Sequence, residues 1–201
     1  MIDERFIFLG IALNFIGSLI YIVAILKGQT KPNRLTWLIW ALAPLIAFFA
    51  EIDQGVGILA LATFIVGFGP LLVFLSSFVN KKAYWRLGRL DIVCGLLSLI
   101  GLGLWGMTRV GNIAIAFSIL SDGTAAIPTV VKSWKAPETE NHWVFTLSVI
   151  NAAIALLTIK VWNFQHYGFP LYILIIGIIF SSLIYFKLGK RLKVISQVIN
   201  P

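Results

Sequence analysis

The stretch SILSDGTAAIPTVVKSWK, from Ser118 to Lys135, resembles a membrane-spanning helix but contains two residues that such a helix rarely tolerates. Asp122 places an acid among apolar and small residues, and Pro128 interrupts the helix six residues later. A charge at the centre of a bilayer costs about 2.5–3.5 kcal/mol even on the mild insertion scale. An acid at this depth is therefore expected to be protonated or to face a hydrated cavity inside a helix bundle.

The whole chain has the composition of an integral membrane protein. Of its 201 residues, 59% are hydrophobic and only 12% are charged, and the mean hydropathy is +0.95. Soluble domains are about half apolar and about a quarter charged, so one soluble core could not bury this much apolar surface. The single cysteine, Cys94, excludes an intrachain disulfide and a cysteine-based metal cluster. No removable signal peptide is expected at the N-terminus.

Seven segments are long and apolar enough to cross a bilayer, which takes roughly 20 residues as a helix. None shows the alternating pattern of a barrel strand, so an all-α integral membrane protein with seven transmembrane helices is predicted. The connections are too short for a further soluble domain. The segments cover about 6–26, 35–51, 56–79, 90–108, 111–131, 143–162 and 169–187.

The basic residues predict the orientation. Thirteen Lys and Arg residues fall on the side that holds the C-terminus and three fall on the other side, which places the N-terminus outside and the C-terminus in the cytoplasm of a plasma (inner) membrane. This segregation explains the net charge of +8, so no nucleic-acid partner is expected. The expected partner is membrane lipid. All seven tryptophans lie near predicted helix ends, as an aromatic belt requires.

An internal repeat organises the predicted helices. At an offset of 105 residues, the segment 24–40 can be laid on 129–145, which places Lys27 on Lys132 and Pro32 on Pro137. Both loops are predicted to be cytoplasmic, so the copies share one orientation and form parallel repeats. The prediction is a three-helix bundle in 1–80, an inversion linker helix in 81–110, and a second three-helix bundle with a short cytoplasmic tail in 111–201.

This 3+1+3 arrangement, with the segment IPTVVKSWKAPETENHW, resembles the PQ-loop superfamily, which includes the SWEET sugar transporters. Pro128 stands at the proline of the family's Pro-Gln signature. Thr129 replaces the glutamine, and Val23 and Ala24 stand where the first copy of Pro-Gln would be. The resemblance implies a substrate site between the two bundles and alternating access by rocking them. The superfamily also contains a cargo receptor.

Asp122 is the strongest candidate for a substrate or proton site. The nearest cation along its helix is Lys132, about 15 Å away at 1.5 Å per residue, and no other predicted helix has Lys or Arg at mid-depth. The structural alternative is a neutral Asp122 that hydrogen-bonds a neighbouring helix. Asn14 and Asn151 join it because a buried carboxamide has four hydrogen-bonding positions to satisfy.

Polar and small residues form stripes at helical spacing on two predicted helices. One stripe contains Asn14, Gly17, Ser18 and Tyr21, and the other contains Ser118, Asp122, Ala125 and Thr129. The offset predicts that the stripes face each other, with Gly17 opposite Asp122. Such residues are also the ordinary packing surface of membrane helices. Three prolines inside helices, Pro128, Pro44 and Pro70, are candidate hinges or static kinks.

The favoured function is a transporter that moves a small polar solute, such as a sugar or an amino acid, by alternating access, with proton coupling left open. A non-transporting receptor or assembly factor on the same fold, and an ion channel, are the alternatives. A homo-oligomer is left open. An enzyme is not expected, since no nucleophile–base–acid set, phosphate loop or redox pair occurs. No metal site is expected, because His142 and His166 fall at opposite faces of the membrane and cannot share a metal ion. No cofactor is expected either: the last predicted helix, 169–187, has no lysine at mid-depth that could bind retinal as a Schiff base.

Overall fold

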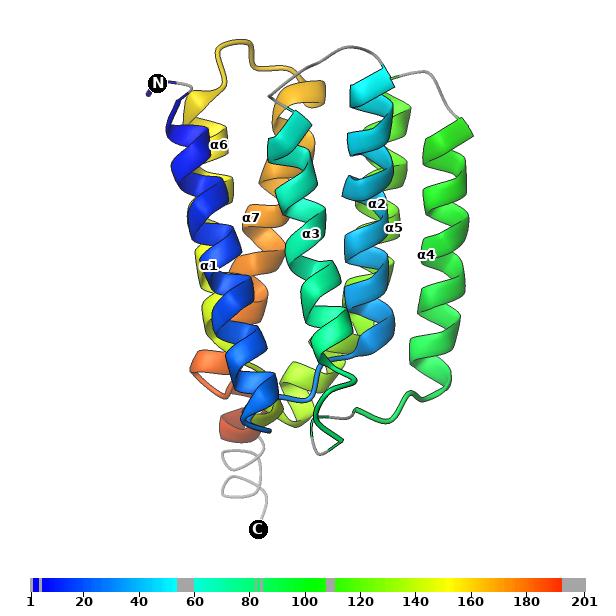
Figure 1. The fold of residues 1–201 in the computed structure, drawn as a ribbon, viewed down its shortest axis with the longest axis vertical. Coiled ribbons are helices and arrows are strands. Elements are labelled where there is room, and N and C mark those ends of the chain that lie inside the picture. Colours follow the sequence, from blue (N-terminus) through cyan, green and yellow to red (C-terminus); the bar gives the residue numbers. More distant parts are fainter. Residues whose placement is uncertain are drawn as a thin grey trace.

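The computed structural model describes residues 2–3, 5–53, 60–81, 83, 85–107 and 111–192, and this part of the chain is all α-helical (Figure 1). It contains seven α-helices and one 3-10 helix. Their bounds are α1 Phe6–Leu26, α2 Arg34–Asp53, α3 Ala60–Ser76, α4 Arg89–Met107, α5 Gly111–Lys135, η2 Pro137–Thr139, α6 His142–Thr158 and α7 Phe164–Tyr185.

The helix bounds follow the predicted segments closely. The all-α class is confirmed, and α1 has the predicted limits. The structure begins α7 five residues earlier than predicted because the side chain of Asn163 accepts a hydrogen bond from the backbone N–H of His166 (3.2 Å) and caps the helix. Residues 56–59, residue 108 and the predicted tail 193–201 lie outside the described residues.

Within the described residues, two helices are long and apolar enough to cross a membrane: Phe6–Leu26 and His166–Tyr185. Two shorter apolar helices cover Thr63–Ser76 and His142–Thr158. In each of the two longer helices only 28% of the most apolar window is buried. Neither helix is thus mostly buried in the protein core, and the crossing of a bilayer by all seven helices stays a prediction.

The helices stand side by side in one bundle, with the N- and C-termini at opposite ends (Figure 1). In the first half, α3 contacts both α1 and α2; in the second half, α7 contacts both α5 and α6. The halves meet where α1 packs on α6 and α2 packs on α5, and α4 packs on α5 and α2. Both halves thus share one packing order, although the division at residues 80 and 110 stays a prediction.

Basic residues gather at the end of the bundle where α1, α3, α5 and α7 end, which is the lower end in Figure 1, and we call it the cationic end. Arg5 and Lys160 lie toward the other end. Between the two ends, large apolar side chains are exposed on the sides of the bundle, among them Leu96 and Ile100 of α4. The described basic residues of the cationic end are Lys27, Lys31, Arg34, Lys81, Arg86, Arg89, Lys132, Lys135, Lys187, Lys190 and Arg191.

A buried network, formed by Lys132, Glu140, Tyr21 and the Lys31 carbonyl, closes the cationic end. The ammonium of Lys132 pairs with Glu140 Oε1 at 2.6 Å, and both side chains are fully buried. The Tyr21 hydroxyl donates to Glu140 Oε2 at 2.5 Å, and Lys132 also donates to the Lys31 carbonyl. Since Lys31 N–H donates to the Thr139 carbonyl (2.8 Å), the two loops related by the sequence repeat are joined directly.

Removal of Glu140 should destabilise the protein strongly. Glu140→Gln would leave the Lys132 ammonium buried without a counter-charge, and breaking a buried pair in this way costs about 3–5 kcal/mol. The matched control is Glu138→Gln. A hydrogen bond from Lys190 (2.8 Å) lowers the pKa of the Glu138 carboxyl, but both side chains are about half exposed, so the expected loss is below about 1 kcal/mol.

Reversible unfolding of both variants in detergent would measure this difference. Equal stabilities of Glu140→Gln and Glu138→Gln would show that the buried pair contributes no more than the exposed one.

Candidate functional site

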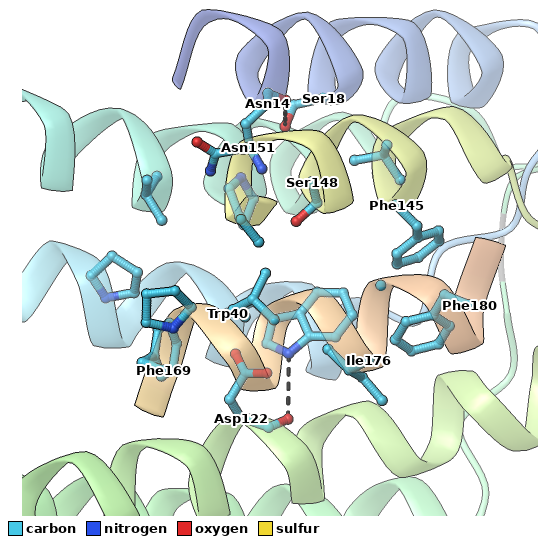
Figure 2. A pocket seen from close by; sticks show the side chains of 18 of the residues that line it. Asn14, Ser18, Trp40, Asp122, Phe145, Ser148, Asn151, Phe169, Ile176 and Phe180 are labelled. Carbon is cyan, nitrogen blue, oxygen red and sulfur yellow. Dashed lines mark hydrogen bonds between the residues drawn. The ribbon is translucent and has the colours of Figure 1, made fainter. Parts of the chain in front are cut away.

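A cavity of about 310 Å³ lies inside the bundle and is lined by residues of α1, α2, α3, α5, α6 and α7 (Figure 2). Three residues that the sequence singled out, Asn14, Asn151 and Asp122, come from three different helices and all line it. Two of the predicted hinge prolines, Pro44 and Pro70, line it as well. The structure thus brings the main sequence-predicted residues together around one space, whereas their role in binding stays a prediction.

One wall of the cavity carries amide and hydroxyl groups. Asn14 and Ser18 of α1 lie beside Ser148 and Asn151 of α6 (Figure 2). In the part of the chain that the structure describes, the carboxamides of Asn14 and Asn151 and the hydroxyl of Ser148 have no hydrogen-bond partner. The Ser18 hydroxyl donates to the backbone carbonyl of Asn14 (3.4 Å). These free groups are available to a ligand or to water, because polar groups inside proteins are rarely left unpaired.

Gly10 explains why Asn151 can lie so close to α1. A Cβ atom at this position would overlap Asn151 Oδ1 and would lie 3.3 Å from the Asn151 Cα atom. The glycine therefore lets the backbones of α1 and α6 approach each other, as small residues do between membrane helices. The amide wall depends on this close approach.

The opposite wall carries Asp122. The Tyr172 hydroxyl of α7 donates to Asp122 Oδ2 at 2.6 Å. The indole N–H of Trp40 donates to the backbone carbonyl of Asp122 (3.5 Å), and the ring lies between Asp122 and the amide wall (Figure 2). Among the described residues no cation contacts Asp122, since Lys132 pairs with Glu140.

Aromatic rings form the floor of the cavity toward the cationic end. The Trp40 ring stands nearly perpendicular to Phe180 (82°, centroids 6.0 Å apart) and to Phe145 (77°, 6.3 Å). Phe145 and Phe180 stack on each other at 4.4 Å. Trp37 and Tyr21, both fully or almost fully buried, pack against this group. The cavity is therefore separated from the cationic end by a packed layer and by the buried network beneath it.

Two predicted site residues lie elsewhere. Tyr21 does not line the cavity, because its hydroxyl is committed to Glu140 in the buried network. Ser118 lies one turn of α5 before Asp122 and is not among the described lining residues. The stripe pattern identified the correct helices but could not show how far along each helix the cavity extends.

The expectation that Gly17 lies opposite Asp122 is wrong. A Cβ at Gly17 would lie 3.0 Å from the Cα of Val144 and 3.4 Å from the Cβ of Leu147, so this glycine permits close packing of α1 on α6. The reason is the packing order: α1 faces α6 across the interface between the halves, and α5 faces α2.

Pro128 is buried but is not among the described lining residues. Nearby, the Thr36 hydroxyl of α2 donates to the Ala125 carbonyl (2.8 Å) and accepts a hydrogen bond from the Thr129 hydroxyl (3.1 Å). The neighbouring helix thus supports the backbone around the proline, as in a static kink. A hinge role of Pro128 stays a prediction.

Sequence reasoning missed the contributions of Trp40 and Tyr172. Trp40 was expected in an interfacial aromatic belt, as was Trp37, yet Trp40 lines the cavity and Trp37 is 2% exposed. Tyr172 offered one signal, since it is a hydroxyl-bearing side chain within the apolar run PLYILIIG. Its partner, Asp122, could not be predicted from this apolar run, because the two residues lie on different helices and are 50 positions apart in the sequence.

Comparison with known proteins gives no match: no family model, no curated protein and no solved structure is similar to this chain. The resemblance to the PQ-loop superfamily therefore depends on topology and on the loop motif, and it stays a prediction.

Gly17→Ala tests the corrected role of this glycine. The added methyl group would press on the Val144 backbone, and overpacking of this kind costs about 1–3 kcal/mol. Gly103→Ala is the matched control, because a Cβ there meets nothing within 4 Å, so its stability should be nearly unchanged. Unfolding in detergent would compare the two. If Gly17→Ala were as stable as Gly103→Ala but altered ligand binding, Gly17 would be a cavity residue after all.

Proposed function

We propose that the protein is a membrane transporter that moves a small polar solute through the central cavity by alternating access. The observation that carries this proposal is the set of polar groups that line one cavity between the two halves of the bundle: the unpaired carboxamides of Asn14 and Asn151, and Asp122, whose carboxyl accepts a hydrogen bond from Tyr172. Ligand sites typically combine an apolar wall with a few well-placed polar groups. A receptor of the same fold should instead have these residues packed against one another, without a cavity.

The surface of the bundle supports a location in a membrane. The two longest apolar helices bury little of their length, unlike the core helices of a soluble protein. Exposed contiguous apolar surface on a soluble monomer rarely exceeds a few hundred Å². Basic residues at one end fit the proposed cytoplasmic side of a multi-pass protein of the plasma membrane.

The closed cationic end supports alternating access. In the proposed cycle a solute enters from the outer side and is released to the cytoplasm, so the aromatic floor and the buried network must separate during each turnover. The contacts α1 with α6 and α2 with α5 are the ones that would shift as the halves rock.

Cysteine labelling tests the orientation. In a Cys94→Ala background, Lys31→Cys and Lys135→Cys should react with a membrane-impermeant maleimide only when the cytoplasmic face is accessible. Lys160→Cys should react from outside, because Lys160 lies toward the end opposite to Lys31 and Lys135. All three side chains are exposed. Labelling of Lys31→Cys or Lys135→Cys in intact cells would contradict the seven-crossing topology.

Asp122→Asn tests transport and its coupling to protons. The amide keeps the shape and can still accept the hydrogen bond from Tyr172, but it cannot titrate. The groups that face Asp122 are Tyr172 and Trp40; neither is expected to titrate near neutral pH. In proteoliposomes, a pH gradient should change the uptake of radiolabelled sugars, amino acids or amines by the wild type, and this response should vanish in Asp122→Asn.

The matched control for this assay is Asp3→Asn, which makes the same chemical change at an exposed site outside the cavity. An unchanged pH response in Asp122→Asn would reduce Asp122 to a structural hydrogen-bond acceptor. Absence of uptake of every solute by the wild type would contradict transport itself.

A further inference from the structure

We propose that the cavity selects a small organic cation, namely an amine with a compact apolar or aromatic body, over sugars and anions. This inference rests on the proposed function, because it names the class of solute for the same cavity. It follows from three features of the lining: the sign of its charge, the arrangement of its aromatic rings, and the small number of its hydrogen-bonding groups.

The charge of the cavity is negative or zero. Asp122 is the one ionisable side chain among the described residues that line it, and no Lys, Arg or His lines it with Asp122. The Tyr172 hydroxyl donates to Asp122 Oδ2, which leaves Oδ1 free of that hydrogen bond. An ammonium group can occupy this free oxygen and supply the counter-charge that a buried carboxylate needs. A solute carboxylate or phosphate would find no base among the described lining residues.

The aromatic rings are suited to the remainder of such a solute. Trp40 lies beside Asp122, and Phe145 and Phe180 stand nearly perpendicular to it. Together they form an aromatic corner into which a ring or an alkyl chain can pack. The N–H edge of Trp40 points to the Asp122 backbone carbonyl, so the ring contributes an apolar aromatic surface beside the carboxyl group. An amine at Asp122 thus gains both an ion pair and an aromatic neighbour.

Hydrogen-bonding groups are too few for a sugar. Apart from the tryptophans, five of the 20 described lining residues have a polar side chain: Asn14, Ser18, Asp122, Ser148 and Asn151. Four of these form the amide wall, on the far side of the Trp40 ring from Asp122 (Figure 2). A sugar would leave hydroxyl groups against aromatic and aliphatic carbon, which is costly. A solute with an ammonium at one end and one polar group at the other satisfies both walls.

Size limits the solute further. A cavity of about 310 Å³ is at the small end of the usual range for ligand sites. It accommodates a monoamine with a single ring.

Three probes with one body and different charge test the proposal. Tyramine carries an ammonium, tyrosol carries a hydroxyl in its place, and 3-(4-hydroxyphenyl)propionate carries a carboxylate. Binding to the full-length protein in lipid nanodiscs is measured by calorimetry, with glucose as a fourth probe. We expect tyramine to bind about 10- to 100-fold more tightly than tyrosol, as a charge-assisted hydrogen bond allows, and the propionate and glucose to bind more weakly than tyramine.

Substitutions assign the preference to particular groups. Asp122→Asn should weaken tyramine binding to near the level of tyrosol. Trp40→Leu should weaken tyramine binding about 2- to 10-fold, the range of an aromatic packing contact, and Trp40→Phe should restore most of it. Asp3→Asn should bind every probe as the wild type does.

Several outcomes would overturn the inference: equal affinity of the wild type for tyramine and tyrosol, tighter binding of glucose, unchanged tyramine binding by Asp122→Asn, or no binding of any probe at millimolar concentration. If Asp122→Asn did not fold, the comparison of probes on the wild type would still decide. Uptake into proteoliposomes separates this inference from the proposed function. Tyramine that binds but is not moved would contradict transport alone, whereas uptake of glucose without binding of tyramine would contradict the inference alone.

Discussion

The buried ion pair between Lys132 and Glu140 is the contact on which the closed bundle depends. Taking both charges out of water is costly, and only good geometry and further hydrogen bonds offset that cost. Here Tyr21 supplies one such bond from α1, and the Lys31 carbonyl supplies another from the loop after α1. The pair therefore holds α1, α5 and both repeat-related loops in one arrangement, and the cavity above it has a floor as a consequence.

Hydration links this network to the proposed transport cycle. Two charges about 4 Å apart interact several times more strongly at a low effective dielectric constant than in water. Entry of water at the cationic end would therefore weaken the Lys132–Glu140 pair, and separation of the pair would admit more water. Opening of that end should accordingly be cooperative. The aromatic floor, with Phe145 stacked on Phe180, resists the first step because its apolar surface would become wet.

Local patterns in the sequence were sufficient for the helices and for much of the cavity. Apolar length and loop chemistry predicted the bounds, and the cost of a polar group in lipid identified Asp122, Asn14 and Asn151. Features that depend on which helix faces which were not predictable in the same way. Gly17 was assigned to the wrong neighbour, and Tyr21 belongs to the buried network. Trp40 and Tyr172 act on Asp122 from helices distant in the sequence.

The two halves use equivalent positions for different purposes. The offset of 105 places Gly17 on Asp122 and Gly67 on Tyr172. In the first half these glycines allow close helix packing, Gly67 against α2 and Gly17 against α6, whereas in the second half the same positions hold a hydrogen-bonded acid and phenol. Trp40 and Phe145 are also related by the offset, and their rings meet between the halves. The cavity therefore has one acidic wall and one amide wall, although the helices around it follow the same packing order in both halves.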